Sequence, residues 1–157
     1  MKLSKITNDI IINPKDNLEL SNYISELLKD FTVNIPMRRD NCGPINWELY
    51  TYLVNKGLDK NKLKMTFGEF KTDNLNLINM RDLTKEERRL YRNLYSDKFT
   101  NEMIIEFIKD QMPESLDDFY YLPHQWLEYD GIILDAASRM FNKGLSKPIS
   151  KENYIKR

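Results

Sequence analysis

The dipeptide Asp130-Gly131 constrains the fold of this chain more than any other feature, because it separates two β-prone runs, FYYLPHQWLEY and GIILDAA. Asp-Gly is a strong signal for a two-residue hairpin turn, since both of its residues tolerate a positive φ. A turn of this kind places Tyr129 opposite Ile132. The sequence therefore predicts an antiparallel hairpin near the C-terminal end of the chain.

The register of this hairpin decides which side chains share a face. Directly opposed residues lie on one face, and faces alternate along a strand. The two-residue turn pairs Trp126 with Asp135 and His124 with Ala137, so all four side chains project to one side. His124 and Asp135 become diagonal neighbours, about 7–8 Å apart at the backbone. A four-residue loop gives the same result, whereas a three- or five-residue loop would put the pair on opposite faces.

Two residue types occur once each in the chain: His124 is the only histidine and Cys42 the only cysteine. A carboxylate that accepts a hydrogen bond from one imidazole nitrogen fixes the tautomer and leaves the other nitrogen free to act as a base. Asp135 is a candidate for that role. A purely structural His–Asp contact and a purely buried cysteine are the alternatives, and both stay open at this point.

Cys42 stands where the polar run RRDN meets a helical pattern that stops at Gly57. The apolar positions of this pattern are Ile45, Leu49, Tyr52 and Leu53. We expect Asp40 or Asn41 to cap the helix, and the partial positive charge of the first turn would lower the pKa of the cysteine and could hold an oxyanion. Gly43 would let a substrate approach closely. Asn41 and Gly43 are therefore candidate oxyanion or substrate-binding residues.

The remaining patterns indicate a single α+β domain over residues 1–157. Residues 17–30 predict a helix, and KLKMTFGEF predicts a half-buried strand with Leu63, Met65 and Phe67 on one face. Residues from about 71 to 118 are more polar and mostly helical by pattern, which indicates an insertion between strands. The lysine-rich residues from about 142 to 157 predict a flexible tail.

Composition argues against several classes of function. The chain carries 24 basic and 24 acidic side chains, a formal net charge of zero, and a nucleic-acid binder usually shows a basic excess. The run RRLYRNLY could suggest base stacking, but the acids around it favour a solvated helix face. We expect no nucleic-acid partner and, because no run approaches about 20 apolar residues, no membrane association.

The scarcity of cysteine and histidine and the lack of a glycine motif argue against common metals and cofactors. One cysteine and one histidine cannot supply the four ligands of a structural zinc site, and no phosphate-binding glycine motif occurs. We therefore expect neither cofactor nor metal. A lone cysteine cannot form an internal disulfide, and the N-terminus lacks a sustained apolar region typical of a signal peptide, so the expected location is the cytoplasm.

Taken in order, these segments resemble the core of the transglutaminase-like branch of the papain-like cysteine protease superfamily. CGPINWELYTYLVNKGLDKNKLKMTFGEF is similar to the nucleophile helix and following strand of that family, and HQWLEYDGIILDAAS to its H-x-W-V-E-x-D-G…D-x-T segment. The resemblance implies a nucleophile helix packed on a small antiparallel sheet, with a helical insertion. It also implies that Cys42 is the nucleophile, His124 the general base and acid, and Asp135 the residue that orients the imidazole.

The resemblance covers about residues 40–70 and 119–138, and it has departures. Ala136-Ala137-Ser138 stands where the family often has Pro-Thr, and residues 71–118 match nothing in it. DNCGP is also similar to a motif of peptidases that process bacteriocin leaders, but Pro36 stands where those enzymes have a glutamine. No side chain is thereby assigned to an oxyanion hole.

The family includes proteases, transglutaminases, other acyl transferases and inactive binding domains. We expect a thiol-dependent acyl-transfer enzyme, with a cysteine protease or amidase acting on a protein or peptide as the first reading. An inactive binding or regulatory protein, such as a viral one, and a transglutaminase or acyltransferase are the alternatives. Trp126 could shield the site or contact substrate, and core packing is its other role.

Overall fold

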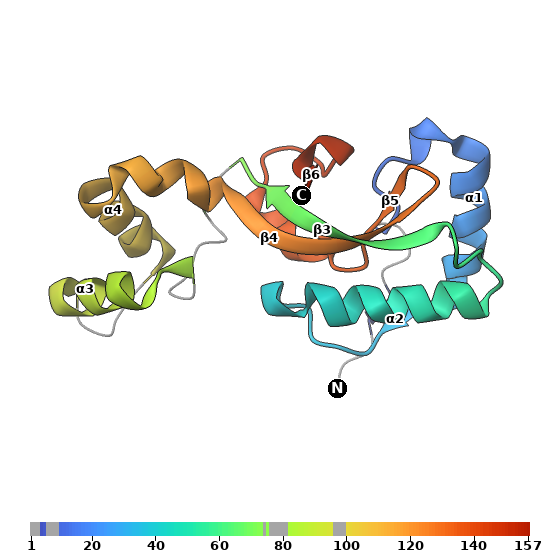
Figure 1. Ribbon diagram of the computed structural model, residues 1–157, viewed down its shortest axis with the longest axis horizontal. Helices are drawn as coiled ribbons and strands as arrows, with labels where there is room; N and C mark the ends of the chain where they lie inside the picture. The colour runs from blue at the N-terminus through green and yellow to red at the C-terminus, as the bar shows by residue number, and fades with distance from the viewer. Residues whose placement is uncertain (1–3, 6–9, 74, 76–81, 96–99) are drawn as a thin grey trace.

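The computed structural model describes residues 4–5, 10–73, 75, 82–95 and 100–157 (Figure 1). The main sheet is antiparallel, with the strand order β5-β4-β3-β6. Its strands are β3 (Leu63–Lys71), β4 (Tyr121–Tyr129), β5 (Ile132–Leu134) and β6 (Tyr154–Lys156). A separate pair joins β1 (Ser4–Lys5) to β2 (Thr32–Val33). The α+β fold class is therefore as predicted.

The hairpin β4-β5 has the register that the sequence predicts. Tyr129 pairs with Ile132 and Leu127 with Leu134, across a two-residue turn. The φ angles of Asp130 and Gly131 are 49° and 83°, both positive, as the tight turn requires. Because β5 ends at Leu134, the first six residues of β4 extend past their partner on this side. The edge of β4 is open there.

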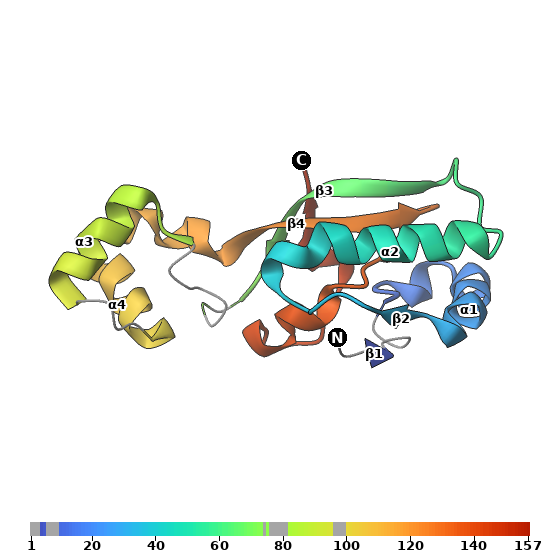
Figure 2. The same cartoon turned by 90° about the horizontal axis from the view of Figure 1, so that it is seen from below.

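Helix α2 (Cys42–Asn55) packs on one face of the sheet. Helix α1 (Leu18–Leu27) lies near the C-terminal end of α2 (Figures 1 and 2). The predicted helical stripe is confirmed, because three of its four positions are fully buried: Ile45, Leu49 and Leu53. They join Leu127 and Leu134 of the sheet in one core cluster. Burial of side chains of this size stabilises a fold by roughly 1.5–3 kcal/mol each, so this contact fixes α2 on the sheet.

Strand β3 pairs with β4 along its whole length, from Leu63 opposite Tyr129 to Lys71 opposite Tyr121. The strand is as predicted, but its burial is not. Phe67, expected on the half-buried face, is 57% exposed, and Phe70 on the other face is fully buried. On the face that carries Leu63, that residue and Met65 pack against the core cluster that includes α2, whereas Phe67 is left at the surface.

The second face of the sheet is covered by the end of the chain. A short 3-10 segment, η6 (Ser138–Gly144), brings Phe141 against Phe70, with ring centroids 3.9 Å apart. The segment η7 (Lys151–Asn153) then leads into β6, which pairs with β3. The prediction of a flexible tail over residues 142–157 is therefore wrong for its last part. A strand of three residues is too short to show a recognisable sequence pattern.

The region between β3 and β4 is mostly helical where it is described. It contains α3 (Lys85–Tyr95), α4 (Asn101–Gln111) and the 3-10 segment η5 (Pro113–Tyr120). These helices pack on one another around a second cluster that includes Tyr91, Phe107 and Ile108. Figure 1 shows α3 and α4 beyond the end of the sheet, not over either face. The predicted insertion thus forms a lobe beside the sheet.

In the described ranges, no helix combines the length and the apolar character needed to cross a bilayer.

Candidate active site

Three predicted residues, Cys42, His124 and Asp135, meet at the start of α2. His124 lies on β4, and Asp135 directly follows β5. His124 Nε2 and Asp135 Oδ2 are 2.6 Å apart, and both side chains are buried, at 3% and 0% exposure. The prediction that the hairpin brings these two within reach is confirmed.

Cys42 interacts with the same ring. His124 Nδ1 is buried and makes no hydrogen bond of standard geometry within the described part of the chain. The Cys42 thiol, which is half-buried, interacts with the ring in a looser hydrogen-bonding contact and through charge. Contacts between nucleophile and base are often long before substrate binds. The order along the site is therefore sulfur, imidazole, carboxylate.

The open edge of β4 explains how a helix on one face reaches an imidazole on the other. Beyond the end of β5, the backbone of Gln125 has no partner strand on that side. Its carbonyl accepts a hydrogen bond from Asn46 Nδ2 at 2.9 Å, and its backbone also hydrogen-bonds the sulfur of Cys42. The first turn of α2 thus takes the place of a neighbouring strand and carries the sulfur to His124.

All the acceptor positions of Asp135 are occupied. Oδ1 accepts from Asn46 Nδ2 at 3.0 Å and from the backbone N–H of Ala137 at 2.9 Å. Oδ2 accepts from His124 Nε2 at 2.6 Å and from the hydroxyl of Tyr154 at 2.7 Å. An ionised carboxylate offers about four such positions. Burial opposes ionisation, but the charge of His124 and these hydrogen bonds together lower the pKa of Asp135 below its usual value. The carboxylate therefore remains an anion.

Asn46 joins the parts of the site. Its Nδ2 donates to the Asp135 carboxylate and the Gln125 carbonyl, as well as to the Cys42 carbonyl at 3.1 Å. Its Oδ1 accepts from the backbone N–H of Ala136 at 2.8 Å. One fully buried amide thus connects α2, β4 and the segment after β5. The sequence pattern does not single out Asn46, although an asparagine four positions after Cys42 lies on the same side of the helix.

The electrostatics favour a thiolate–imidazolium pair. Burial opposes ionisation of Cys42, but the hydrogen bond and charge of His124 and the backbone of Gln125 lower the thiol pKa below its usual value. Burial also disfavours a charged His124, but the charge and hydrogen bond of Asp135, with a smaller contribution from Cys42, raise the pKa of His124 from 6.5 to about 9. A lowered thiol pKa and a raised imidazole pKa together favour the state in which the proton of the pair resides on the ring.

The auxiliary residues named from sequence behave differently from expectation. Asn41 occupies the N-cap position but caps nothing, because its side chain donates to the carbonyl of Pro36 at 2.8 Å. The 3-10 turn η3 (Arg39–Asn41) runs directly into α2 and replaces the expected cap. The side chain of Asn41 is therefore engaged away from the proposed oxyanion position.

Gly43 and Trp126 do not have the substrate-binding role expected of them, and Trp126 has instead its alternative role in the core. A Cβ atom at Gly43 would lie 2.7 Å from Oε1 of Gln125, so the space expected for substrate holds the Gln125 side chain. Trp126 is fully buried and cannot contact a substrate. Its ring stacks on His124 with centroids 5.8 Å apart, and it packs against Tyr154. Trp126 therefore shields the imidazole as part of the core.

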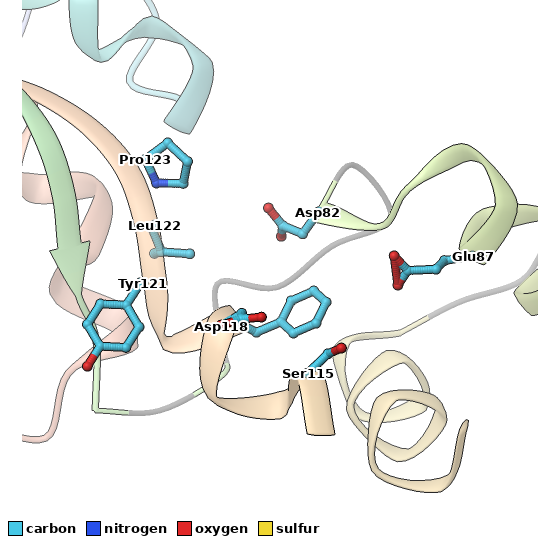
Figure 3. Close-up of a pocket in the computed structure, with 8 residues that line it drawn as sticks. Asp82, Glu87, Ser115, Asp118, Tyr121, Leu122 and Pro123 are labelled. Atoms are coloured by element: carbon cyan, nitrogen blue, oxygen red, sulfur yellow. The ribbon is translucent and has the colours of Figure 1, made fainter. Parts of the chain in front are cut away.

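A cavity of about 370 Å³ lies between the start of β4 and the insertion (Figure 3). Leu122 and Pro123, which directly precede His124, form one wall. Three carboxylates, those of Asp82, Glu87 and Asp118, lie around the rest of it. Figure 3 draws its lining residues beside the start of β4, and Figure 1 shows that α2 begins at the same end of the sheet. It offers space for a bound molecule beside the site.

No protein-family model, curated protein or solved structure matches this chain.

Proposed function

We propose that this protein is a thiol-dependent acyl-transfer enzyme with a transglutaminase-like core, in which Cys42, His124 and Asp135 form the catalytic triad. One observation carries the proposal: the only sulfhydryl of the chain interacts with its only imidazole, and a buried carboxylate lies 2.6 Å from Nε2 of that ring. Nucleophile, base and orienting acid in this order are what acyl transfer requires.

The proposed reaction begins from the ion pair. The Cys42 sulfur attacks an amide carbonyl carbon, and the carbonyl electrons move onto its oxygen. The positive end of the α2 dipole supports that negative charge. When the C–N bond breaks, the imidazolium of His124 gives its Nδ1 proton to the leaving amine, which leaves a thioester on Cys42. Throughout, Asp135 keeps the Nε2 proton directed away from the reacting atoms.

The thioester then passes to an acceptor. Water gives hydrolysis: neutral His124 removes one of its protons, the hydroxide attacks the thioester carbon, and the thiolate leaves. We place hydrolysis of a peptide or protein amide first, because water is the commonest acceptor and the cavity beside Pro123 can hold part of such a substrate. An amine acceptor would use the same groups and give transfer.

Labelling with a thiol-directed probe tests the proposal. Cys42 is the only thiol, so the rate of reaction with iodoacetamide at about pH 6 reports this site alone. We expect the folded protein to react much faster than a simple thiol such as glutathione. Cys42→Ala should give no labelling, and Asp135→Asn should react more slowly because the imidazolium loses its charged partner.

If wild type reacts with iodoacetamide no faster than glutathione does at pH 6–7, the proposal that the protein is an enzyme is refuted. Should labelling be fast, a peptide library followed by mass spectrometry identifies the cleaved bond. Adding a primary amine to the same library shows whether the acyl group goes to water or to nitrogen.

A further inference from the structure

Tyr154 hydrogen-bonds the same carboxylate oxygen as the imidazole. Its hydroxyl donates to Asp135 Oδ2 at 2.7 Å, beside His124 Nε2 at 2.6 Å. The pairing of β6 with β3 brings it there, with Tyr154 opposite Phe70. Its ring meets those of Phe70 and Trp126 edge-on, with centroids 5.3 and 5.1 Å away. The hydroxyl is therefore held at one position by packing on two sides.

The hydrogen bond between Tyr154 and Asp135 depends on the close packing of β6 against β3. A Cβ atom at Gly68 would lie 2.0 Å from the Ile155 carbonyl oxygen, so β6 sits close against β3 only because this position is glycine. The contact between Tyr154 and Asp135 is thus built into the sheet.

A donor on a carboxylate oxygen draws negative charge away from it and makes it a weaker base. Without that donor, Asp135 would hold the imidazolium more tightly, and His124 would be a poorer acid toward a leaving amine. We propose that Tyr154 is a positioning residue of the proposed enzyme, which fixes the Asp135 carboxylate and limits how strongly it retains the proton of His124. Its effect on catalysis rests on the proposed function, but its effect on the imidazole does not.

The titratable groups that face this His–Asp pair, among the described residues, are Cys42 from α2 and Tyr154 from β6. Burial, with the charge and hydrogen bond of Asp135, raises the pKa of Tyr154 well above its usual value. The phenol therefore stays protonated and remains a donor wherever the imidazole titrates. A change at Tyr154 must act on His124 through Asp135.

The test compares Tyr154→Phe with Tyr129→Phe. Both tyrosines are buried in the main sheet, at 8% and 7% exposure, but Tyr129 belongs to the cluster under α2. Because His124 is the only histidine, one pair of imidazole nitrogen resonances in a ¹⁵N-labelled sample reports its tautomer and titration without assignment. We expect Tyr154→Phe to move the His124 titration to higher pH and Tyr129→Phe to leave it in place.

Activity gives a second readout. In Tyr154→Phe we expect kcat/KM at neutral pH to fall about 10-fold, mainly through kcat, with the alkaline limb of the pH profile moved upward. An imidazole titration identical in wild type and folded Tyr154→Phe would overturn the inference. Since the imidazole is observed without substrate, an inactive wild type would overturn the proposed function and leave this test intact.

If Tyr154→Phe fails to fold, fluorinated tyrosine in the wild-type sequence provides a second test. Biosynthetic 3-fluorotyrosine keeps the ring in place and makes each phenol a stronger donor. In the wild-type sequence we expect it to move the His124 titration to lower pH, opposite in sign to the effect of Tyr154→Phe. An unchanged titration would overturn the inference by itself.

Discussion

Replacing Cys42 by serine should make stability fall more steeply than in wild type as pH rises from 6.5 toward about 9. The reason is the number of protons that each state binds. In unfolded wild type, His124 loses its proton near 6.5 and Cys42 keeps its own until about 9.0. In the folded protein the pKa of the thiol is lowered and that of the imidazole is raised, so the thiol loses its proton at a lower pH than in the unfolded chain while the imidazole keeps its own. Loss of the thiol proton in the folded state offsets loss of the imidazole proton in the unfolded state, so stability falls less steeply with pH than it would with the imidazole alone.

Serine removes the thiol, and with it the proton that the folded wild type loses. The folded pKa of His124 is raised, so its stabilising contribution is complete below 6.5 and is lost as pH rises through the folded value. Without a thiolate, nothing compensates this loss. The slope should approach about −1.4 kcal/mol per pH unit. With 6.5 and about 9 as the limits, the total is at most about 3 kcal/mol. It should be smaller, because serine also removes the Cys42 contribution to the raised pKa.

Urea unfolding followed by circular dichroism, repeated from pH 6 to 9.5, measures this effect. Every other titrating group is shared, so the difference in free energy of unfolding between wild type and Cys42→Ser isolates the pair. We expect that difference to grow with pH and to level off before pH 9. A difference independent of pH over this range would show that sulfur and imidazole do not form an ion pair, and the reading of the site would be refuted.

Other consequences can be measured on the same material. Acylation by an amide substrate should decline near pH 9, as the imidazolium of His124 loses its proton, whereas alkylation of Cys42 by iodoacetamide should show no such decline. Asn46→Ala should cost about 2–4 kcal/mol in urea unfolding, because it leaves buried partners without hydrogen bonds, while Asn55→Ala at the exposed end of α2 should cost less than about 1 kcal/mol. Gly68→Ala should displace β6 and move the His124 imidazole titration to higher pH, as loss of the Tyr154 hydroxyl does.

The parts of the site that could be predicted from sequence are those set by local geometry. A two-residue turn fixes the register of β4 and β5, and the register alone brings His124 and Asp135 to one face. In the same way, the helical spacing after Cys42 determines which side of α2 is buried. Both inferences need only neighbouring residues and a fixed period, 2 for the strand and 3.6 for the helix.

The residues that sequence analysis missed depend on contacts between distant segments. Tyr154 reaches Asp135 only because a three-residue strand pairs with β3, and no period is visible in three residues. Asn46 gains its role from acceptors on β4 and after β5, which the helix sequence does not contain. The prediction that Asn41 caps α2 is wrong because a polar residue just before a helix indicates a cap whether or not that residue lies in a 3-10 turn.

The short length of β5 underlies the whole arrangement. Beyond Leu134 the chain leaves β4, so backbone N–H groups that a longer strand would pair need other acceptors. Asn46 Oδ1 takes the N–H of Ala136, and Asp135 Oδ1 takes that of Ala137. The same departure exposes the backbone of Gln125 to the first turn of α2. Two more residues of pairing in β5 would place Ala136 opposite Gln125, satisfy the N–H of Ala136 within the sheet and occupy the Gln125 backbone that α2 now contacts. The end of the strand and the meeting of sulfur with imidazole are therefore one structural feature.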